Sequence, residues 1–290
     1  MLDLFLDVLL DTVLDAVKLT PFLFLTYLVM EYIEHKTSEK AANIVGKAGR
    51  FGPVIGGILG VVPQCGFSAA ASNLYAGRII SVGTLIAIYL STSDEMLPIF
   101  ISEQVDAAVI FKILGLKLLI GMIAGLIIDF VRSKLHKPFM HPRYEIDHLC
   151  EHEHCHCEEG NVLMSAVRHT LHILLFIFLI TFVLNGVIAI VGEDALAGLI
   201  QNKPILGPMI AGVVGLIPNC AASVVITQLF LEGVLGTGAM LAGLLVGAGV
   251  GLLILFRVNN HWKENCKIVV LLYVIGVAAG ILIELSGIVI

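Results

Sequence analysis

Charged side chains are scarce in this sequence. Lys, Arg, Asp and Glu make up 14% of its 290 residues, whereas hydrophobic residues make up 58% and the mean hydropathy is +0.98. Soluble globular domains carry about 25% charged residues, so the composition excludes that class. The apolar stretches reach the roughly 20 residues needed to cross a bilayer. The chain is therefore predicted to be an all-α membrane protein whose first partner is the lipid bilayer.

Two signatures of other functions are missing as well. No Walker P-loop occurs, so an ion gradient is the expected driving force for any transport. Apart from His169 and His172 near one end of a span, the predicted membrane segments contain no histidine that could act as a base. We therefore expect no enzyme, no cofactor and no nucleic-acid partner. A membrane thiol oxidoreductase stays open as an alternative of a different class.

What the chain has instead is an internal repeat. The tripeptide Pro63-Gln64-Cys65 returns as Pro218-Asn219-Cys220, and the same gap-free shift of 155 residues gives 9 identities in 23 positions over 52–74. Over 112–128 the shift gives 8 identities in 17 positions. Duplicated apolar chains with paired, Gly/Pro-interrupted segments are typical of secondary transporters, and the interruptions point to the binding site.

Basic residues predict the topology. Thirteen of the 17 Lys and Arg fall in loops on one side of the expected spans, which the positive-inside rule makes cytoplasmic. This holds only if 52–77 and 207–232 each return to the side they start from. Each is broken by a proline into two half-helices of roughly 11 residues, or about 16 Å, half a bilayer. The six complete spans are expected near 14–34, 80–102, 107–131, 169–190, 235–256 and 267–288.

Three crossings and one re-entrant hairpin per repeat make the halves inverted. The predicted domains are repeat 1 (1–135, hairpin 52–77), a cytoplasmic His/Cys-rich linker (136–160) and repeat 2 (161–290, hairpin 207–232). Both termini are expected outside the cell membrane. The alternative, one broken helix crossing once per repeat, would make the repeats parallel.

The hairpin tips carry the first candidate site. Pro63 and Pro218 break the helices and free backbone carbonyls, which persist at membrane depth only inside protein or a polar cavity. Cys65 and Cys220 then lie at the positive end of the next half-helix, where a thiolate is stabilised. The alternative is a pair of small buried hydrophobes. The expected ligands are Cys65, Cys220, Gln64, Asn219, Ser68 and Ser223.

Two acids break the repeat symmetry. Asp94 and Glu95 lie inside the apolar span 80–102, whereas their repeat counterparts are uncharged. Carboxylates are costly in a membrane helix and mark an ion pathway or a proton relay. Both are therefore candidate metal ligands and proton-coupling groups. The alternative is that they begin an outer loop.

The linker provides a third cluster of candidate ligands. They are His148, Cys150, His152, His154, Cys155, His156 and Cys157. Such a tract favours Zn²⁺ or Cu⁺, but without the paired spacing of a folded zinc module we expect a flexible chelating loop. On the cytoplasmic side its thiols should stay reduced. A solvated linker without a metal role is the alternative.

Several of these patterns together resemble a known family. They are the paired motif G-P-x-I-x-G-x-x-G-x-x-P-[QN]-C-x-x-S, the run 91–98 around Asp94-Glu95, the His/Cys-rich loop and the run 255–259. They are similar to the ten-helix heavy-metal exporters, whose members are labelled arsenic efflux proteins or manganese transporters. The resemblance implies metal or metalloid efflux. Four half-helices and six crossings would make the ten segments.

The substrate follows from the ligand types. Thiolates favour arsenite, Zn²⁺ or Cu⁺, whereas carboxylates and amide oxygens favour Mn²⁺. The mixed set predicts export of a divalent transition metal of the Mn/Zn type by a proton- or ion-coupled antiporter. Arsenite or organoarsenical efflux is the alternative, and a homo-oligomer stays open.

Overall fold

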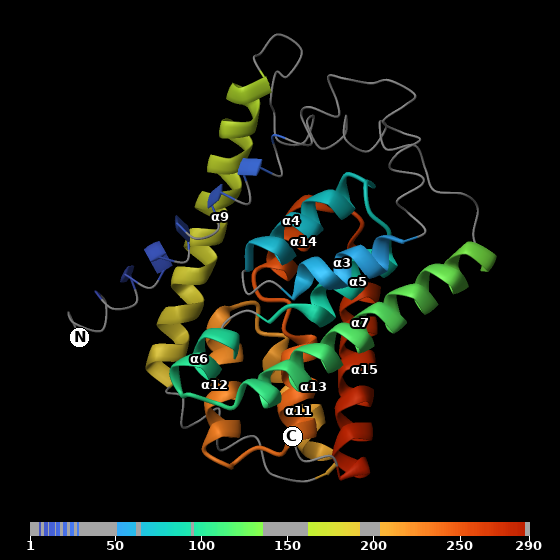
Figure 1. The fold of residues 1–290 in the computed structure, drawn as a ribbon. Coiled ribbons are helices and arrows are strands. Elements are labelled where there is room, and N and C mark those ends of the chain that lie inside the picture. Colours follow the sequence, from blue (N-terminus) through green and yellow to red (C-terminus); the bar gives the residue numbers. More distant parts are fainter. Residues whose placement is uncertain are drawn as a thin grey trace.

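The computed structural model describes residues 51–61, 65–93, 96–135, 162–191 and 204–287, with single positions between 6 and 28. All regular structure in these residues is helical, which confirms the predicted all-α class (Figure 1). The helices are α3 (Gly52–Gly60), α4 (Cys65–Ala76), α5 (Val82–Ser91), α6 (Met96–Ser102), α7 (Ala107–Leu135), α9 (Val162–Val191), α11 (Leu206–Gly215), α12 (Cys220–Leu231), α13 (Thr237–Val246), α14 (Gly251–Val258) and α15 (Trp262–Ser286).

Helix starts follow the sequence repeat. Helices α4, α5, α6 and α7 begin 155 residues before α12, α13, α14 and α15, respectively. The turns after α4 and α12 also match, because Arg78 (φ 56°) and Gly233 (φ 74°) both adopt the left-handed conformation. The duplicated sequence therefore folds into two equivalent series of five helices.

Glycine pairs set the closest helix crossing in each half. A Cβ added to Gly83 on α5 would lie 2.2 Å from the carbonyl oxygen of Gly125 on α7. In the second half, a Cβ on Gly238 of α13 would lie 2.3 Å from the carbonyl oxygen of Gly280 on α15. No real Cβ approaches an oxygen this closely, so only glycine lets these backbones touch.

An acid next to each crossing caps the partner helix. Asp129 near the end of α7 accepts a 2.9 Å hydrogen bond from the backbone N–H of Gly83, in the first turn of α5. Its repeat counterpart Glu284 accepts one of 2.6 Å from the N–H of Gly238, in the first turn of α13. Asp129 also accepts a hydrogen bond from the hydroxyl of Ser81, the N-cap of α5. Each carboxylate thus lies at the positive end of a helix.

The two halves are interlocked. Helix α4 of the first half packs on α14 of the second, and α12 of the second half packs on α6 of the first. The rings of Phe100 (α6) and Phe230 (α12) mark the second contact, with centroids 6.2 Å apart. In each case the second arm of one predicted hairpin covers the other half, so neither half completes its core alone.

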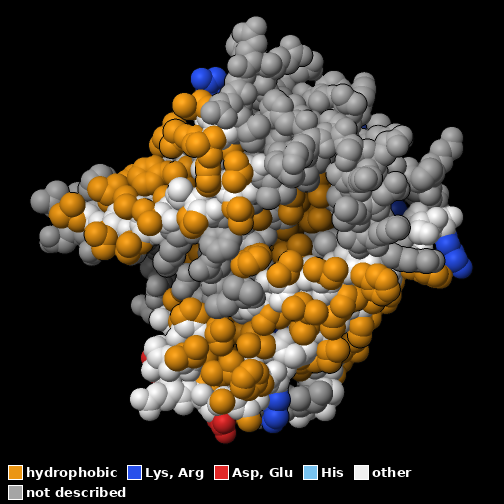
Figure 2. All heavy atoms as spheres, turned by 45° about the horizontal axis from the view of Figure 1, so that its top comes forward, with side chains coloured by type: hydrophobic (Ala, Val, Ile, Leu, Met, Phe, Trp, Pro, Cys, Tyr) orange, Lys and Arg blue, Asp and Glu red, His pale blue; other side chains and the backbone are white. Residues whose placement is uncertain are grey.

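Five helical segments within the described residues are long and apolar enough to cross a membrane. They are Val82–Ser102, Ala107–Lys134, Ala166–Val183, Thr237–Val258 and Trp262–Ser286. They match five of the six predicted spans, and the sixth, 14–34, lies mostly outside the described residues. Hydrophobic side chains cover most of the described surface in Figure 2, with charges at its margins. The protein is therefore a multi-pass membrane protein.

The end of α7 meets the start of its repeat equivalent α15. Arg132 near the end of α7 lies 3.3 Å from Glu264 at the start of α15. In Figure 1, α3 and α4 lie in the upper part of the molecule, and α11 and α12 in the lower part. The two-fold axis in the membrane plane, the count of ten segments and the domain boundaries stay predictions.

Candidate functional site

The helix break predicted around Pro218 is present. Helix α11 ends at Gly215 and α12 begins at Cys220, with Asn219 as its N-cap in an extended conformation. In the first half α3 ends at Gly60 and α4 begins at Cys65, the equivalent position. Each of these cysteines therefore starts a helix, where the free backbone N–H groups make a positive end.

Two further breaks were not predicted. The sequence predicted continuous spans at 80–102 and 235–256, but α5 ends at Ser91 and α13 at Val246, and a new helix follows each. The backbone leaves helical geometry at Thr92 (ψ 129°) and at Gly247 (ψ 93°). In the two interrupted spans, Val82–Ser102 and Thr237–Val258, 75% and 83% of the most apolar 18 residues are buried inside the protein. In the three continuous spans the buried share is 20–33%. The interrupted helices thus form the interior.

The first break meets the first hairpin tip. Ser93, just past the end of α5, donates a 2.7 Å hydrogen bond to the carbonyl oxygen of Val61, the C-cap of α3. The backbones also approach closely, since a Cβ on Gly60 would lie 2.8 Å from the carbonyl oxygen of Ile88. A carbonyl freed by one interruption is therefore satisfied by a hydroxyl from another, as buried polar backbone requires.

The second half repeats this approach. A Cβ on Gly215 at the end of α11 would lie 2.3 Å from the carbonyl oxygen of Gly243 on α13, and these residues are the counterparts of Gly60 and Ile88. Beyond the tip, the Asn219 and Cys220 side chains are buried. The Ser223 hydroxyl donates to the Cys220 carbonyl oxygen at 2.7 Å. Three predicted ligands thus lie on one turn at this tip.

The second break lies against α4. The Ser72 hydroxyl is 2.7 Å from the carbonyl oxygen of Gly251, the first residue of α14, and 2.7 Å from the Tyr89 hydroxyl. Ser68, a predicted ligand, is fully buried one turn earlier, and a Cβ on Gly251 would lie 2.8 Å from its Cβ. The hairpin arm of one half thus carries a polar contact to the break of the other half.

Lys117 joins the two halves at their centre. Its side chain is 1% exposed, and its ammonium donates to the carbonyl oxygens of Thr92 (2.6 Å) and Leu244 (2.7 Å). These oxygens lie at the C-terminal ends of α5 and α13, two helices that occupy equivalent places in the two repeats. The repeat counterpart of Lys117 is Leu272, which is also buried. An ionisable residue inside an apolar span is functional by default.

Sequence reasoning missed Lys117, although a signal was there. Thirteen of the 17 Lys and Arg lie in the predicted basic loops, and Lys117 is one of the four that do not. It falls in the middle of the predicted span 107–131, at a repeat position that holds leucine in the second half.

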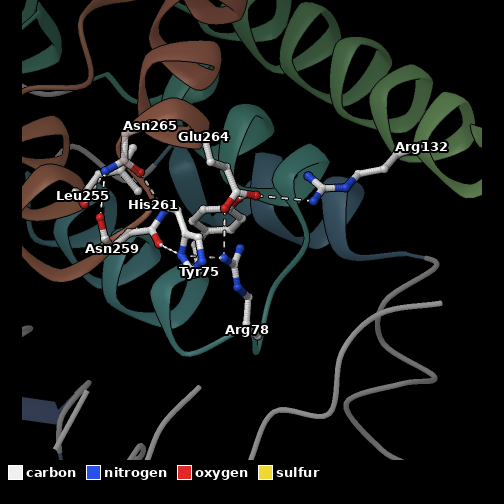
Figure 3. Close-up of polar contacts among 8 residues, drawn as sticks. All are labelled: Tyr75, Arg78, Arg132, Leu255, Asn259, His261, Glu264 and Asn265. Carbon is white, nitrogen blue, oxygen red and sulfur yellow. Dashed lines mark hydrogen bonds and ion pairs between the residues drawn. The ribbon is translucent and has the colours of Figure 1, made fainter. Parts of the chain in front are cut away.

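A second polar cluster closes one end of the molecule (Figure 3). The Glu264 carboxylate accepts hydrogen bonds from the Tyr75 hydroxyl (2.5 Å) and from Arg78 (2.8 Å) and Arg132 (3.3 Å). It thereby ties the turn after α4 and the end of α7 to the start of α15. Beside it, the Asn259 side chain donates to Asn265 at 2.6 Å, fixing the α14–α15 turn. Asn259, part of the run that carried the family resemblance, has this structural contact.

Several predicted residues lie outside the described part of the chain. They are Pro63, Gln64, Asp94, Glu95 and the linker residues His148, Cys150, His152, His154, Cys155, His156 and Cys157. Cys65 is placed as the first residue of α4, but its side chain is not described. Within 51–61, 65–93, 96–135, 162–191 and 204–287, no three His, Cys, Asp or Glu side chains converge on a metal site.

The comparison with protein families gave a match. Residues 3–194 match the model of a family described as "Putative, 10TM heavy-metal exporter". The matched region covers the first series of helices, Lys117 and the linker. The comparisons with curated proteins and with solved structures gave no match.

Proposed function

Because the chain belongs to the family of ten-helix heavy-metal exporters, we propose that it exports a divalent transition metal ion of the Mn/Zn type. Transport is secondary, driven by a proton or another ion gradient, and proceeds by alternating access. The substrate leaves the cell chemically unchanged, so the protein is a transporter and not an enzyme.

The observation that carries this proposal is the meeting of helix breaks in the interior. The breaks after α5 and α13 are each in contact with a hairpin tip or a hairpin arm, through Ser93–Val61 and Ser72–Gly251. Transporters place their substrate where discontinuous helices expose carbonyls and helix ends near the bilayer midplane. Helix breaks at membrane depth are costly unless they are buried in protein or line a cavity. A membrane protein with only a structural role would not need several of them in its interior.

The ligand chemistry favours a borderline ion. Backbone carbonyls near the breaks, the amides of Gln64 and Asn219 and the carboxylates of Asp94 and Glu95 are hard oxygen donors. Cys65 and Cys220 add soft sulfur at two helix starts. We assign Asp94 and Glu95 the role of proton coupling, and Ser68 and Ser223 an auxiliary role in the same site.

Arsenite is the second candidate. Cys220 is the first residue of α12, at the positive end of a helix, which stabilises the thiolate that arsenite prefers. Its counterpart Cys65 starts α4 in the same way. A site dominated by these two sulfurs would take arsenite or an organoarsenical in place of Mn²⁺ or Zn²⁺.

The orientation completes the proposal. Both termini lie outside, and the linker 136–160 lies in the cytoplasm, where its His and Cys residues collect metal before export. The basic residues Arg78 and Arg132 both contact Glu264, so they share one end of the molecule, as a single cytoplasmic face requires.

Flux into proteoliposomes tests the function. Purified protein is reconstituted with an imposed pH gradient, and the uptake of Mn²⁺, Zn²⁺, arsenite and methylarsenite is followed separately. We expect saturable Mn²⁺ or Zn²⁺ flux that collapses with the gradient. Flux of the arsenicals alone would establish the second candidate, and reduction of a substrate disulfide without any flux would establish the oxidoreductase.

Cysteine variants test the site with a matched control. Cys65→Ser and Cys220→Ser should each lower metal affinity at least about tenfold, because a hydroxyl replaces a soft ligand. Their combination should cost less than the sum, since both act on one ion. Cys266→Ser on α15 is the control and should leave flux unchanged. Normal flux in the Cys65→Ser/Cys220→Ser protein would reduce both cysteines to packing residues.

A further inference from the structure

We propose that the Lys117 ammonium is a tethered cation that competes with the transported metal ion for the space between the ends of α5 and α13. When the metal binds, Lys117 loses its proton, and when the metal leaves, it takes one up. This inference rests on the proposed function, and it adds a coupling group that the sequence motifs do not contain.

The first argument is the kind of partner that Lys117 has. Its ammonium contacts two backbone carbonyl oxygens, Thr92 at 2.6 Å and Leu244 at 2.7 Å. Thr92 is the C-cap of α5, and Leu244 lies in the last turn of α13. The C-terminal end of a helix carries a partial negative charge. Two such ends with freed carbonyls are the elements with which transporters bind small cations.

The second argument is the location between the halves. The two carbonyls come from equivalent helices of the two repeats, so the ammonium bridges the elements that move against one another during alternating access. A cation there holds both helix ends together. Its loss or replacement changes the contact between the halves, which is the change that a transport cycle needs.

The third argument is the cost of keeping a lysine in this place. The side chain is 1% exposed in an apolar span, and the second half has Leu272 at the equivalent position. The equivalent helix α15 therefore forms and packs with a leucine at this position. The helix itself does not require a charge at this position, and a buried charge is expensive to keep.

Among the described residues, the helices packed against the helix of Lys117 carry few titratable groups. Helices α3, α5 and α13 pack against α7. Of these, α3 and α13 have no titratable side chain, and α5 has one, Tyr89, whose hydroxyl lies 2.7 Å from Ser72 and donates to the Gly251 carbonyl oxygen at 3.2 Å. On α7 itself, Lys112, Asp129, Arg132 and Lys134 are the other charged residues. Asp94 and Glu95 follow Thr92 in sequence and lie outside the described residues.

The exchange balances in atoms, and with one proton returned for each divalent ion it moves one net positive charge out of the cell per cycle. In the inward-open state a divalent ion enters from the cytoplasm, and the ammonium passes its proton to cytoplasmic water, leaving a neutral amine. In the outward-open state the ion leaves, and the amine takes a proton from external water. One transport cycle thus exports one metal ion and imports one proton through Lys117. No covalent bond other than N–H forms or breaks.

Proton counting on metal binding tests the proposal. Wild-type protein and Lys117→Met in detergent and weak buffer are titrated with Mn²⁺ and with Zn²⁺ while a pH indicator reports the protons released. Cysteine and carboxylate ligands release the same protons in both proteins, so the difference isolates Lys117. We expect the Lys117→Met protein to release one proton fewer per metal ion. Between about pH 6 and about pH 7, the metal affinity of wild type should also rise tenfold more than that of Lys117→Met.

Two controls keep the outcome interpretable. Lys117→Arg keeps a charge that cannot be given up, so it should stay folded by size exclusion and lose metal binding at least about tenfold. Equal proton release by wild type and Lys117→Met, or wild-type affinity in Lys117→Arg, would overturn the tethered-cation proposal while leaving metal export standing. If wild type binds neither ion, the proposed function fails, and the inference fails with it.

Discussion

The two halves of the molecule share a frame and differ at the centre. Gly83, Gly125 and Asp129 have the counterparts Gly238, Gly280 and Glu284, which make the same contacts. Lys117, by contrast, faces a helix end of each half while its counterpart is Leu272. A duplication preserves what both copies need in order to fold. A residue that only one copy keeps, at a high cost of burial, is where the single substrate pathway has to be sought.

The largest effect should come from closing the space at the glycine crossings. In Gly125→Ala the new Cβ would lie 2.5 Å from the Gly83 carbonyl oxygen, and in Gly280→Ala 2.5 Å from that of Gly238. Backbone cannot rotate away as a side chain does, so each variant should lose at least about 2 kcal/mol of stability. Thermal unfolding in detergent measures the loss.

The same helix offers a matched control for the glycine variants. A Cβ on Gly115 of α7 would meet nothing within 4 Å. Gly115→Ala should therefore be neutral or stabilise by up to about 1 kcal/mol, through helix propensity alone. If Gly280→Ala unfolds like wild type while Gly125→Ala does not, only one half depends on its crossing, and the shared frame would be wrong.

A smaller loss is expected from each of the two capping acids, and it should be larger at Asp129, which also accepts from the Ser81 hydroxyl. Asp129→Ala and Glu284→Ala each remove an acceptor from the first turn of α5 or α13. Each should cost about 1–2 kcal/mol, as other helix caps do. Because the caps belong to different helix pairs, the double variant should show the sum. Glu103→Ala, in the exposed turn after α6, is the control, and a loss in only one of the two cap variants would break the comparison.

The smallest effect should come from the Glu264 cluster, which joins the two halves at one end. Glu264→Gln removes the charge that Arg78 and Arg132 share. Solvent screens the half-exposed Arg132, and glutamine keeps an oxygen that accepts from the more buried Arg78. The loss of stability should stay below about 1 kcal/mol. It should also shrink as salt rises, which unfolding at low and high ionic strength would detect. A large loss that salt does not change would mean that the hydrogen bonds, and not the charges, hold this end together.

The sequence predicts the frame well because the frame is repeated. Glycine and proline positions that recur after 155 residues marked both helix starts at Cys65 and Cys220, and composition marked the apolar spans. Family membership was also confirmed over residues 3–194. The predicted ligands Asn219, Cys220 and Ser223 lie at one break, but their approach to Ser68 or to Asp94 and Glu95 stays a prediction.

The interior was predicted less well, for physical reasons. The break after Val246 lies in a stretch as apolar as the continuous spans, so hydropathy cannot reveal it, whereas the stretch broken after Ser91 is the least apolar of the five. Asp129 and Gly83 are 46 residues apart in sequence, and the cap they form depends on how the helices cross. Lys117 has backbone carbonyls as partners, and a carbonyl leaves no trace in the residue type.

The packing of α4 against α14 also imposes a delay during synthesis, because α4 is made long before its partner. The contact between Ser72 and Gly251 spans 179 residues. A ribosome adding about 5–20 residues per second needs roughly 10–35 s to cover that distance. Throughout that interval α4 has been synthesised, but its partner α14 has not. A nascent chain arrested before Gly251 should therefore expose α4 to protease or to chaperones, and release of the arrest should protect it.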